Sequence, residues 1–206
     1  MTTGPKANKG SMMKSYPVLF NGDMVRAILA GRKSQTRRPM KQAPRLASCE
    51  DIAWQPHWCP YGVPGDELWV RETHATGVEG CPNGVSYRAD HIDPRGDGPA
   101  HPMKWTPSIL MPRVLARIHL TVTDVRIQRV QDISEEDAVA EGAQRFDAIP
   151  VGRLGSPARW SMGTPATTDQ CLGTPRFAFG NAWEKAYQDG WDRNPWLWAI
   201  TFEVKK

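Results

Sequence analysis

The sequence of 206 residues lacks any apolar run of the roughly 18 residues that a membrane-spanning helix needs. Leu, Ile, Val and Phe together make up only about 18% of the chain, close to the level at which strongly charged chains are disordered. The net charge is only +4, however, and nine Trp supply further apolar surface. We therefore expect one folded domain whose apolar residues are concentrated in a few segments and which makes no contact with a membrane.

Cysteine is also scarce, and the four cysteines are irregularly spaced at Cys49, Cys59, Cys81 and Cys171. This pattern excludes a disulfide scaffold and is typical of free thiols in the cytoplasm. No His/Cys spacing fits a standard zinc site, so we expect neither a metal nor a cofactor. Residues 1–13 contain no apolar segment of a secretory signal. We expect them to form a disordered leader before a single domain over 14–206.

Several motifs of known enzyme classes are absent from the sequence. There is no GxxxxGK or GxGxxG phosphate-binding loop, no HExxH, no CxxC and no GxSxG nucleophile motif. The zinc-deaminase pattern of H-x-E with P-C-x-x-C is missing as well. The sequence therefore gives no indication of a P-loop ATPase, a dinucleotide-dependent enzyme or a metal hydrolase.

The apolar residues that are present predict short helices and strands joined by long loops. Helices are predicted over 24–30, 135–141 and 177–188, and strands over 67–73, 85–89, 116–130 and 196–204. Within 116–130 the apolar phase changes at Thr123 and Asp124, which is typical of a β-bulge. Gly and Pro, 18 of each, are typical of turns and long loops, which we expect at about 41–60, 75–103 and 145–176. We predict an α+β, mainly β fold with a small twisted or barrel-like sheet.

Acidic residues are absent from residues 24–49, which carry seven basic ones: Arg26, Arg32, Lys33, Arg37, Arg38, Lys41 and Arg45. Because the whole chain carries only +4, the rest of it is slightly acidic. A local basic block of this kind favours contact with phosphate groups, and so with nucleic acid or a nucleotide. A solvated surface would show the same composition.

Two features inside and outside this block indicate acid–base chemistry. Lys33 and Thr36 are three residues apart, so a helical or tight turn would bring their side chains together. A lysine whose pKa is lowered by burial and by neighbouring arginines can accept the proton of a threonine hydroxyl. Glu141 falls at the end of a predicted helix, where the helix dipole opposes a carboxylate. We expect a cationic cluster to compensate it, and Lys33 is a candidate.

Five segments, in order along the chain, resemble the ASCH domain family, a relative of the PUA RNA-binding fold. Residues 31–38 (GRKSQTRR) fit its signature G-x-K-x-x-T-x-R, and the other segments are 64–72, 105–113, 132–142 and 194–198. The chain is most similar to the larger ASCH proteins of phages and prophages. The resemblance implies a PUA-like β-barrel with short flanking helices, a cationic cleft, and insertions at about 41–60, 75–103 and 145–176.

A compact branch of that family consists of amidohydrolases that remove the acetyl group from N4-acetylcytidine. Carried over by motif, its catalytic lysine, threonine and glutamate fall on Lys33, Thr36 and Glu141. Our first hypothesis is therefore a metal-independent amidohydrolase acting on an N4-acylated cytidine nucleoside or a similar modified base. Thr36 would be the nucleophile and Lys33 the general base, while Glu141 would orient Lys33.

Two other hypotheses use the same basic residues. One is a non-catalytic module that binds RNA or single-stranded nucleic acid, and the other is a metal-independent ribonuclease. For ligand or nucleic-acid binding we single out seven residues: Arg32, Arg37, Arg38, Arg71, Glu72, Trp105 and Arg113. Arg71, Glu72 and Arg113 would equally fit structural salt bridges. The sequence does not indicate an oligomeric state.

Overall fold

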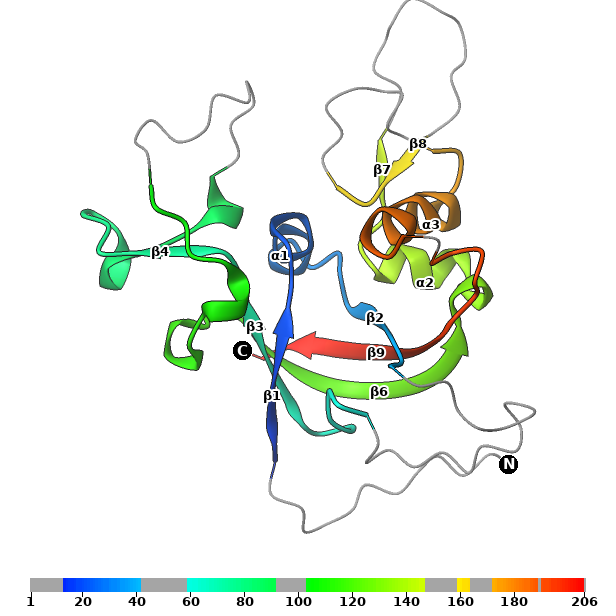
Figure 1. Ribbon diagram of the computed structural model, residues 1–206, viewed down its shortest axis with the longest axis horizontal. Coiled ribbons are helices and arrows are strands. Elements are labelled where there is room, and N and C mark those ends of the chain that lie inside the picture. The colour runs from blue at the N-terminus through cyan, green and yellow to red at the C-terminus, as the bar shows by residue number, and fades with distance from the viewer. Residues whose placement is uncertain are drawn as a thin grey trace, which may run out of the picture.

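A computed structural model describes residues 13–41, 59–91, 103–146, 159–163, 172–188 and 190–205. Within these ranges the main feature is a five-stranded mixed sheet in the order β1-β3-β6-β9-β2 (Figure 1). Strands β1 and β3 run parallel, whereas the other neighbouring pairs are antiparallel. Its strands are β1 (Ser15–Leu19), β2 (Gln35–Pro39), β3 (Glu67–Arg71), β6 (His119–Arg129) and β9 (Trp196–Val204).

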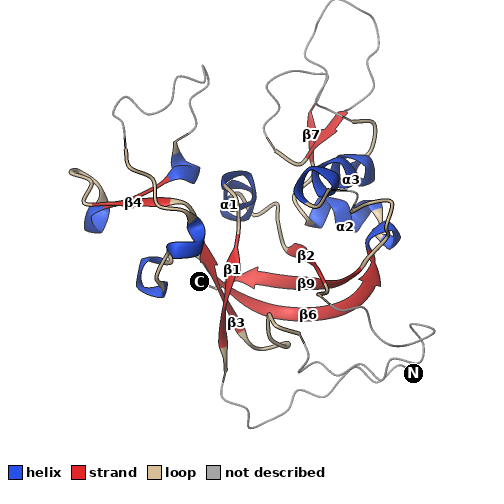
Figure 2. Cartoon of the chain, viewed as in Figure 1, coloured by secondary structure: helices blue, strands red, loops and turns tan. Residues whose placement is uncertain are grey.

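Two short hairpin-like sheets accompany the main sheet. One pairs β4 (His74–Thr76) with β5 (Val85–Tyr87), and the other pairs β7 (Gln144–Phe146) with β8 (Arg159–Ser161). Short 3-10 turns punctuate the loops: η2 (Pro82–Gly84), η3 (Arg88–Asp90), η4 (Ser108–Leu110), η5 (Arg113–Leu115) and η6 (Val130–Asp132). Figure 2 shows the two small sheets near opposite ends of the curved main sheet, on the side where the α-helices lie.

The described α-helices are α1 (Gly22–Leu29), α2 (Glu135–Ala140) and α3 (Pro175–Ala186). Each begins at a polar N-cap whose side chain accepts a hydrogen bond from a backbone N–H: Asn21, Ser134 and Thr174. Helix α3 begins two residues before the predicted start because Thr174 caps it and Pro175 occupies the first turn, where a missing N–H costs nothing. No described helix is long and apolar enough to cross a membrane.

The buried apolar side chains form two clusters that share strand β9. The first cluster joins α1 to strands β1, β3, β6 and β9. The second joins α2 and α3 to β9 through residues that include Ala138, Phe179 and Trp183. Along β9, Leu197 and Ala199 belong to the second cluster, and Trp198 and Ile200 belong to the first. This follows from the alternation of side chains along a strand.

The predicted α+β, mainly β class is confirmed, and so is the bulge, since the register of β6 against β9 shifts between Val122 and Asp124. Closure into a barrel is not seen. In the part of the chain that the structure describes, no ladder joins the edge strands β1 and β2. These two strands are consecutive in the sequence but are linked through α1, which packs Val25 and Ile28 into the first cluster. The sheet is therefore open and curved.

Some local predictions need correction. The sequence pattern did not predict β1 and β2, and the predicted helical or tight turn over Lys33 and Thr36 is wrong, because Thr36 lies in a strand. The proposed insertions contain the β4–β5 pair and most of the β7–β8 pair. Residues 1–12 and most of 41–60 lie outside the described residues.

Candidate active site and adjoining pockets

Lys33 lies in the short loop that leads from α1 into β2, and its side chain is completely buried. Its ammonium donates three hydrogen bonds: to Glu141 Oε2 at 2.7 Å, to the Glu141 carbonyl at 2.8 Å and to the Gln35 carbonyl at 2.7 Å. Burial lowers the pKa of Lys33 below its ordinary value, and the Glu141 carboxylate opposes that effect. The predicted contact between Lys33 and Glu141 is thus present, across 108 positions of sequence.

Glu141 is the C-cap residue of α2 and is 3% exposed. Its second oxygen, Oε1, accepts a hydrogen bond from Arg37 Nη1 at 3.2 Å. The other terminal nitrogen of Arg37 pairs with Asp137 Oδ2 at 2.7 Å, and Nη1 also donates to the Gln35 side chain. Two cations, Lys33 and Arg37, therefore compensate the carboxylate that the helix dipole disfavours. We call Lys33, Arg37, Asp137 and Glu141 the buried charge cluster.

Thr36 lies on β2 between two residues that serve this cluster, Gln35 and Arg37. Its side chain is fully buried, and its Oγ1 has no hydrogen-bond partner among the described residues. No hydrogen bond joins it to Lys33. Side chains alternate along a strand, so Thr36 shares a face of β2 with Arg38. Both Lys33 and Arg38 lie over the ring of Phe20. Lys33 Nζ is 5.6 Å and Arg38 Cζ is 5.2 Å from the ring centroid.

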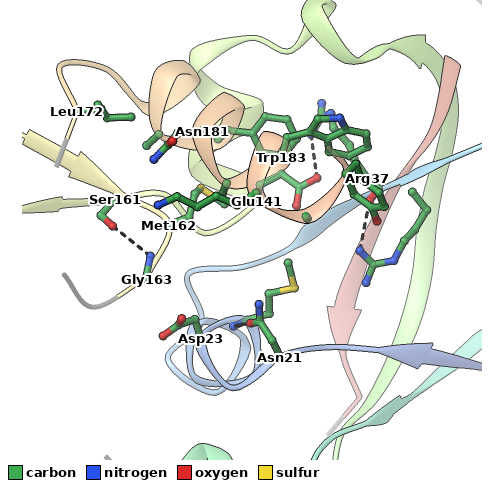
Figure 3. A pocket seen from close by; sticks show the side chains of 18 residues that line it. Asn21, Asp23, Arg37, Glu141, Ser161, Met162, Gly163, Leu172, Asn181 and Trp183 are labelled. Atoms are coloured by element: carbon green, nitrogen blue, oxygen red, sulfur yellow. Dashed lines mark hydrogen bonds and ion pairs between the residues drawn. The ribbon is translucent and has the colours of Figure 1, made fainter. Parts of the chain in front are cut away.

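A cavity of about 450 Å³ adjoins the buried charge cluster (Figure 3), a volume within the range of small-molecule sites. The start of α1 forms one wall with Asn21 and Asp23, and β8 and α3 form the opposite wall with Ser161 and Asn181. Arg37, Arg38 and Glu141 line it from the side of the cluster, and Phe179, Trp183 and Tyr187 add aromatic surface. We call this space the main cavity.

The three predicted catalytic residues relate differently to the main cavity. Glu141 lines it, whereas Lys33 and Thr36 are buried and are not part of its lining. Lys33 and Glu141 are therefore in contact as expected, whereas Thr36 neither hydrogen-bonds to a described residue through its hydroxyl nor lines the main cavity.

In the part of the basic block that the structure describes, ion pairs occupy Arg26, Lys33 and Arg37, and Lys41 is exposed. Arg26 pairs with Asp23, and Lys33 and Arg37 belong to the buried charge cluster. Arg32 is exposed. Arg38 hydrogen-bonds only to carbonyls, those of Leu19 at 2.7 Å and of Arg37 at 3.3 Å, and it makes no ion pair with a described residue. Within the described part of the block, Arg32 and Arg38 are thus the arginines that stay open to a ligand.

The other candidate binding residues are spread over the molecule. Glu72 is buried in a two-pronged salt bridge with Arg117, and Arg113 pairs with Glu67 at 2.9 Å, so both fit the structural alternative. Trp105 packs edge-on against the His91 ring. None of these residues lines the main cavity. Arg71 differs because it is held by two backbone carbonyls and lines a second cavity.

Sequence reasoning missed several residues that line the main cavity or support the cluster. In the sequence, Asn21 indicates only the start of a helix, and Asp137 is only one of the acidic residues in the first turn of a predicted helix. Asn181 and Tyr187 lie on or beside α3, where the apolar pattern indicated a core helix and nothing more. The described residues include no group of three or more His, Cys, Asp or Glu side chains placed to hold a metal ion.

Comparison with known proteins gives a distant likeness. No family model matches this chain, and no curated protein matches it. The chain is similar to a solved structure, the crystal structure of protein EF3133 from Enterococcus faecalis V583, which carries the family-model designation DUF984. The two share 13% sequence identity at a TM-score of 0.36, over 94% of this chain and 81% of that chain. A likeness at this level carries no argument about family, activity or substrate.

Proposed function

We propose that this protein is an amidohydrolase that removes the acyl group from an N4-acylated cytidine nucleoside or a similarly modified base. The observation that carries the proposal is the buried charge cluster at the wall of the main cavity. Burying three or four charges costs more than burying apolar residues of similar size. Clusters of this kind beside a cavity are characteristic of functional sites.

The resemblance of residues 31–38 to the ASCH signature supports the same proposal. It assigns catalytic roles to Lys33, Thr36 and Glu141, two of which are in direct contact. We further infer that the open, curved sheet is a variant of the PUA-like fold of that family. The cavity suits a pyrimidine nucleoside because it combines aromatic side chains for stacking with the amides of Asn21 and Asn181 for the edge of the base.

The chemistry follows from the groups present. Lys33 in its neutral form, which burial favours, takes the proton of Thr36 while Oγ1 attacks the acyl carbon. The tetrahedral intermediate then expels the N4 amine, to which Lys33 returns the proton, and leaves an acyl ester on Thr36. Water hydrolyses this ester with the same base and releases the carboxylic acid. Arg38, on the same face of β2 as Thr36, would stabilise the oxyanion.

Two local rearrangements are required. Thr36, which is buried and does not line the main cavity, must become accessible to the substrate, and Lys33 must exchange one hydrogen bond. In the structure Lys33 Nζ donates to the carbonyl of Gln35, the residue that directly precedes Thr36. Exchange of this hydrogen bond for one to the Thr36 hydroxyl would connect nucleophile and base. Such tightening on substrate binding is common in active sites.

The test is the release of cytidine and acetate from N4-acetylcytidine by the purified protein, measured by chromatography. Thr36→Val removes the hydroxyl at nearly constant shape, and we expect activity to fall by several orders of magnitude. Thr36→Ser, which keeps a hydroxyl, serves as the matched control and should retain part of the activity. A Thr36→Val protein that is as active as the wild type, or a wild type inactive on a panel of N4-acylated cytidines, would refute the proposal.

The same variant separates activity from folding. Because Thr36 Oγ1 is buried and has no partner among the residues that the structure describes, its replacement should leave the free energy of unfolding unchanged or raise it by about 1 kcal/mol. For a chain of this size that corresponds to an increase in Tm of a few degrees. Thermal unfolding by circular dichroism measures it, and a clear fall in Tm would show that the hydroxyl has a structural partner.

The nucleic-acid-binding and ribonuclease hypotheses both need an extended basic surface. Ion pairs occupy Arg26, Lys33 and Arg37, so the described residues favour a ligand in the cavity. Tight binding of RNA with a steep dependence on salt would reverse this preference.

A further inference from the structure

A second cavity of about 520 Å³ lies next to the main cavity. The two share four lining residues, Asn21, Met24, Arg38 and Tyr187, so they adjoin one another. Arg38 therefore stands at the junction.

The second cavity differs from the main cavity in its charge. Its described lining includes two arginines, Arg38 and Arg71, and no carboxylate, whereas the main cavity also contains Asp23 and Glu141. Arg71 donates from Nε to the Met111 carbonyl at 3.1 Å and from Nη2 to the Ile109 carbonyl. Neither arginine forms an ion pair with a described residue. Two guanidinium groups are thus held in position by backbone carbonyls, and no carboxylate of a described residue compensates their charge.

Leu19 connects the two arginines. Its carbonyl accepts the hydrogen bond from Arg38 Nη2, and in the β1–β3 ladder it lies directly opposite Arg71. Adjacent strands are about 5 Å apart. Arg38 lies on β2 and Arg71 on β3, which β6 and β9 separate in the sheet order, so the two side chains reach the cavity from different parts of the sheet. Both are anchored by backbone carbonyls rather than by acids.

The remaining polar groups of the lining can donate hydrogen bonds. Burial raises the pKa of Tyr61, with Arg38 opposing the shift, so its phenol keeps its proton at neutral pH. Tyr187 supplies a second hydroxyl. The side-chain oxygen of Asn21 already accepts from the Met24 N–H at 2.9 Å, which leaves its amide nitrogen as a donor. A wall of donors around two guanidinium groups matches a phosphate group.

We propose that the second cavity is a phosphate subsite, and that the ligand of this protein is a nucleoside phosphate rather than a bare nucleoside. The inference rests on the proposed function in one respect, namely that the nucleoside occupies the main cavity. Arg38 and Arg71 would bind the phosphate oxygens, and Tyr61 and Tyr187 would complete the site. The phosphate can belong to a free nucleotide or to the end of a strand, because the same oxygens are presented in both.

The test is isothermal titration calorimetry of the whole protein with cytidine and with cytidine 5′-monophosphate. Two charged hydrogen-bonding partners should make the monophosphate bind at least about tenfold tighter than cytidine at low salt. Arg71→Gln should bring the ratio of the two affinities close to one, and Arg71→Lys should keep part of it. Arg113→Gln is the matched control, since Arg113 is an exposed arginine that lines neither cavity and pairs with Glu67.

Equal affinity of the wild type for cytidine and its monophosphate would overturn the proposal, as would an absence of binding. The same loss in Arg71→Gln and Arg113→Gln would also overturn it, because it would indicate a general effect of charge. If Arg71→Gln does not fold, Tyr61→Phe replaces it and should lower the affinity ratio several-fold. A cytidine dinucleotide distinguishes the sources: binding as tight as that of the monophosphate indicates a strand, and weaker binding a free nucleotide.

The outcomes separate this inference from the proposed function. A protein that prefers the monophosphate but does not release acetate from N4-acetylated substrates supports the subsite and refutes the amidohydrolase. A protein that deacylates N4-acetylcytidine but binds the monophosphate no tighter than cytidine supports the amidohydrolase and refutes the phosphate subsite.

Discussion

The contact between Lys33 and Glu141 illustrates how one residue can serve both stability and chemistry. All three ammonium hydrogens of Lys33 are taken up by Gln35 and Glu141, and the side chain is out of contact with solvent. The lysine thereby ties the loop after α1 to the end of α2. Removing the Glu141 charge leaves the buried ammonium without a carboxylate, and removing Lys33 leaves Glu141 with Arg37 as its remaining counterion.

We therefore predict that Lys33→Met lowers the free energy of unfolding by about 3–5 kcal/mol, measured by urea denaturation. Glu141→Gln should cost at least as much, because the buried ammonium of Lys33 then has no carboxylate, whereas Arg37 still pairs with Glu141 in Lys33→Met. The double variant should lose clearly less than the sum of the two, since neither unpaired charge is left behind. Additive losses would contradict a direct coupling of the two side chains.

At the scale of elements, the end of α2 determines where Glu141 lies. Gly142 follows it with φ = +108°, a conformation that favours glycine, and a Cβ there would come 3.3 Å from the Cβ of Ala27 in α1. Gly31, which ends α1, also has a positive φ of +69° but has nothing within 4 Å of such a Cβ. The two glycines thus allow conformational strain to be separated from close packing.

We predict that Gly31→Ala costs about 1 kcal/mol through backbone strain alone, and that Gly142→Ala costs about 2–3 kcal/mol. The second variant should also reduce deacylation, because the displaced helix end carries Glu141. Chemical denaturation and the cytidine-release assay measure the two effects. Equal costs for both variants would show that the contact with Ala27 is unimportant.

Glu67, the first residue of β3, links several strands of the sheet. A hydrogen bond from Lys205, with further ones from Ser15 and His119, lowers the pKa of Glu67 from 4.5 to about 2 against the opposing effect of burial. A carboxylate whose pKa is depressed on folding contributes stability that is present above the unfolded value. That stability is lost as the pH falls from about 4.5 toward 2.

The expected result is a fall in Tm over this pH interval that is less steep in Glu67→Gln than in the wild type. Thermal unfolding at a series of pH values from about 7 to about 2 provides the measurement. At neutral pH the variant should be less stable than the wild type, and near pH 2 the two should converge. Parallel curves for the two proteins would show that Glu67 titrates normally.

The elements also show which parts of the fold the sequence could predict. The helix over 135–141, the strand at the C-terminus and the bulge in β6 were predicted correctly, because apolar spacing and capping residues are local signals. Strand β2 was missed because its buried side chains include Gln35 and Arg37, which are satisfied by acids of α2 a hundred residues away. A search for apolar alternation cannot recognise a strand whose interior is polar and paired.

Part of the candidate site could be predicted from the sequence, because Glu141 also gives a local signal. Glu141 attracted attention because the helix dipole disfavours it, and that argument led to its cationic partner. The second cavity gave no signal, because Tyr61, Arg71 and Tyr187 are brought together only by the packing of β1, β3 and α3. Whether Arg38 or Arg71 has an acidic partner also depends on contacts between segments that are distant in the sequence, so the sequence alone does not show it.

At the scale of the whole molecule, the two apolar clusters share strand β9, which lies between β6 and β2 in the main sheet (Figure 1). Neither cluster can lose its β9 residues while the other keeps its own, so we predict one cooperative unfolding transition. Far-UV circular dichroism and tryptophan fluorescence, which reports on Trp198 in the first cluster and Trp183 in the second, should give the same midpoint.

Phe179→Ala extends this prediction to a variant. The change removes a large side chain from the second cluster only and should cost about 3–5 kcal/mol. Both signals should still move together to a lower denaturant concentration. Two separate transitions, in the wild type or in the variant, would mean that the clusters unfold independently.

The bulge at Val122 and Asp124 has a consequence for the distance between the two halves of the buried charge cluster. Deleting Thr123 would keep Leu120, Val122 and Val125 on one side of β6, so the apolar pattern would survive. The strand, however, would lose the extra bend that a surplus residue creates. Since α2 follows the far end of β6 through η6, a straighter strand would carry the acids away from the edge strand that holds their basic partners. A shorter chain with every apolar side chain in place would fold around a pocket whose charges no longer meet.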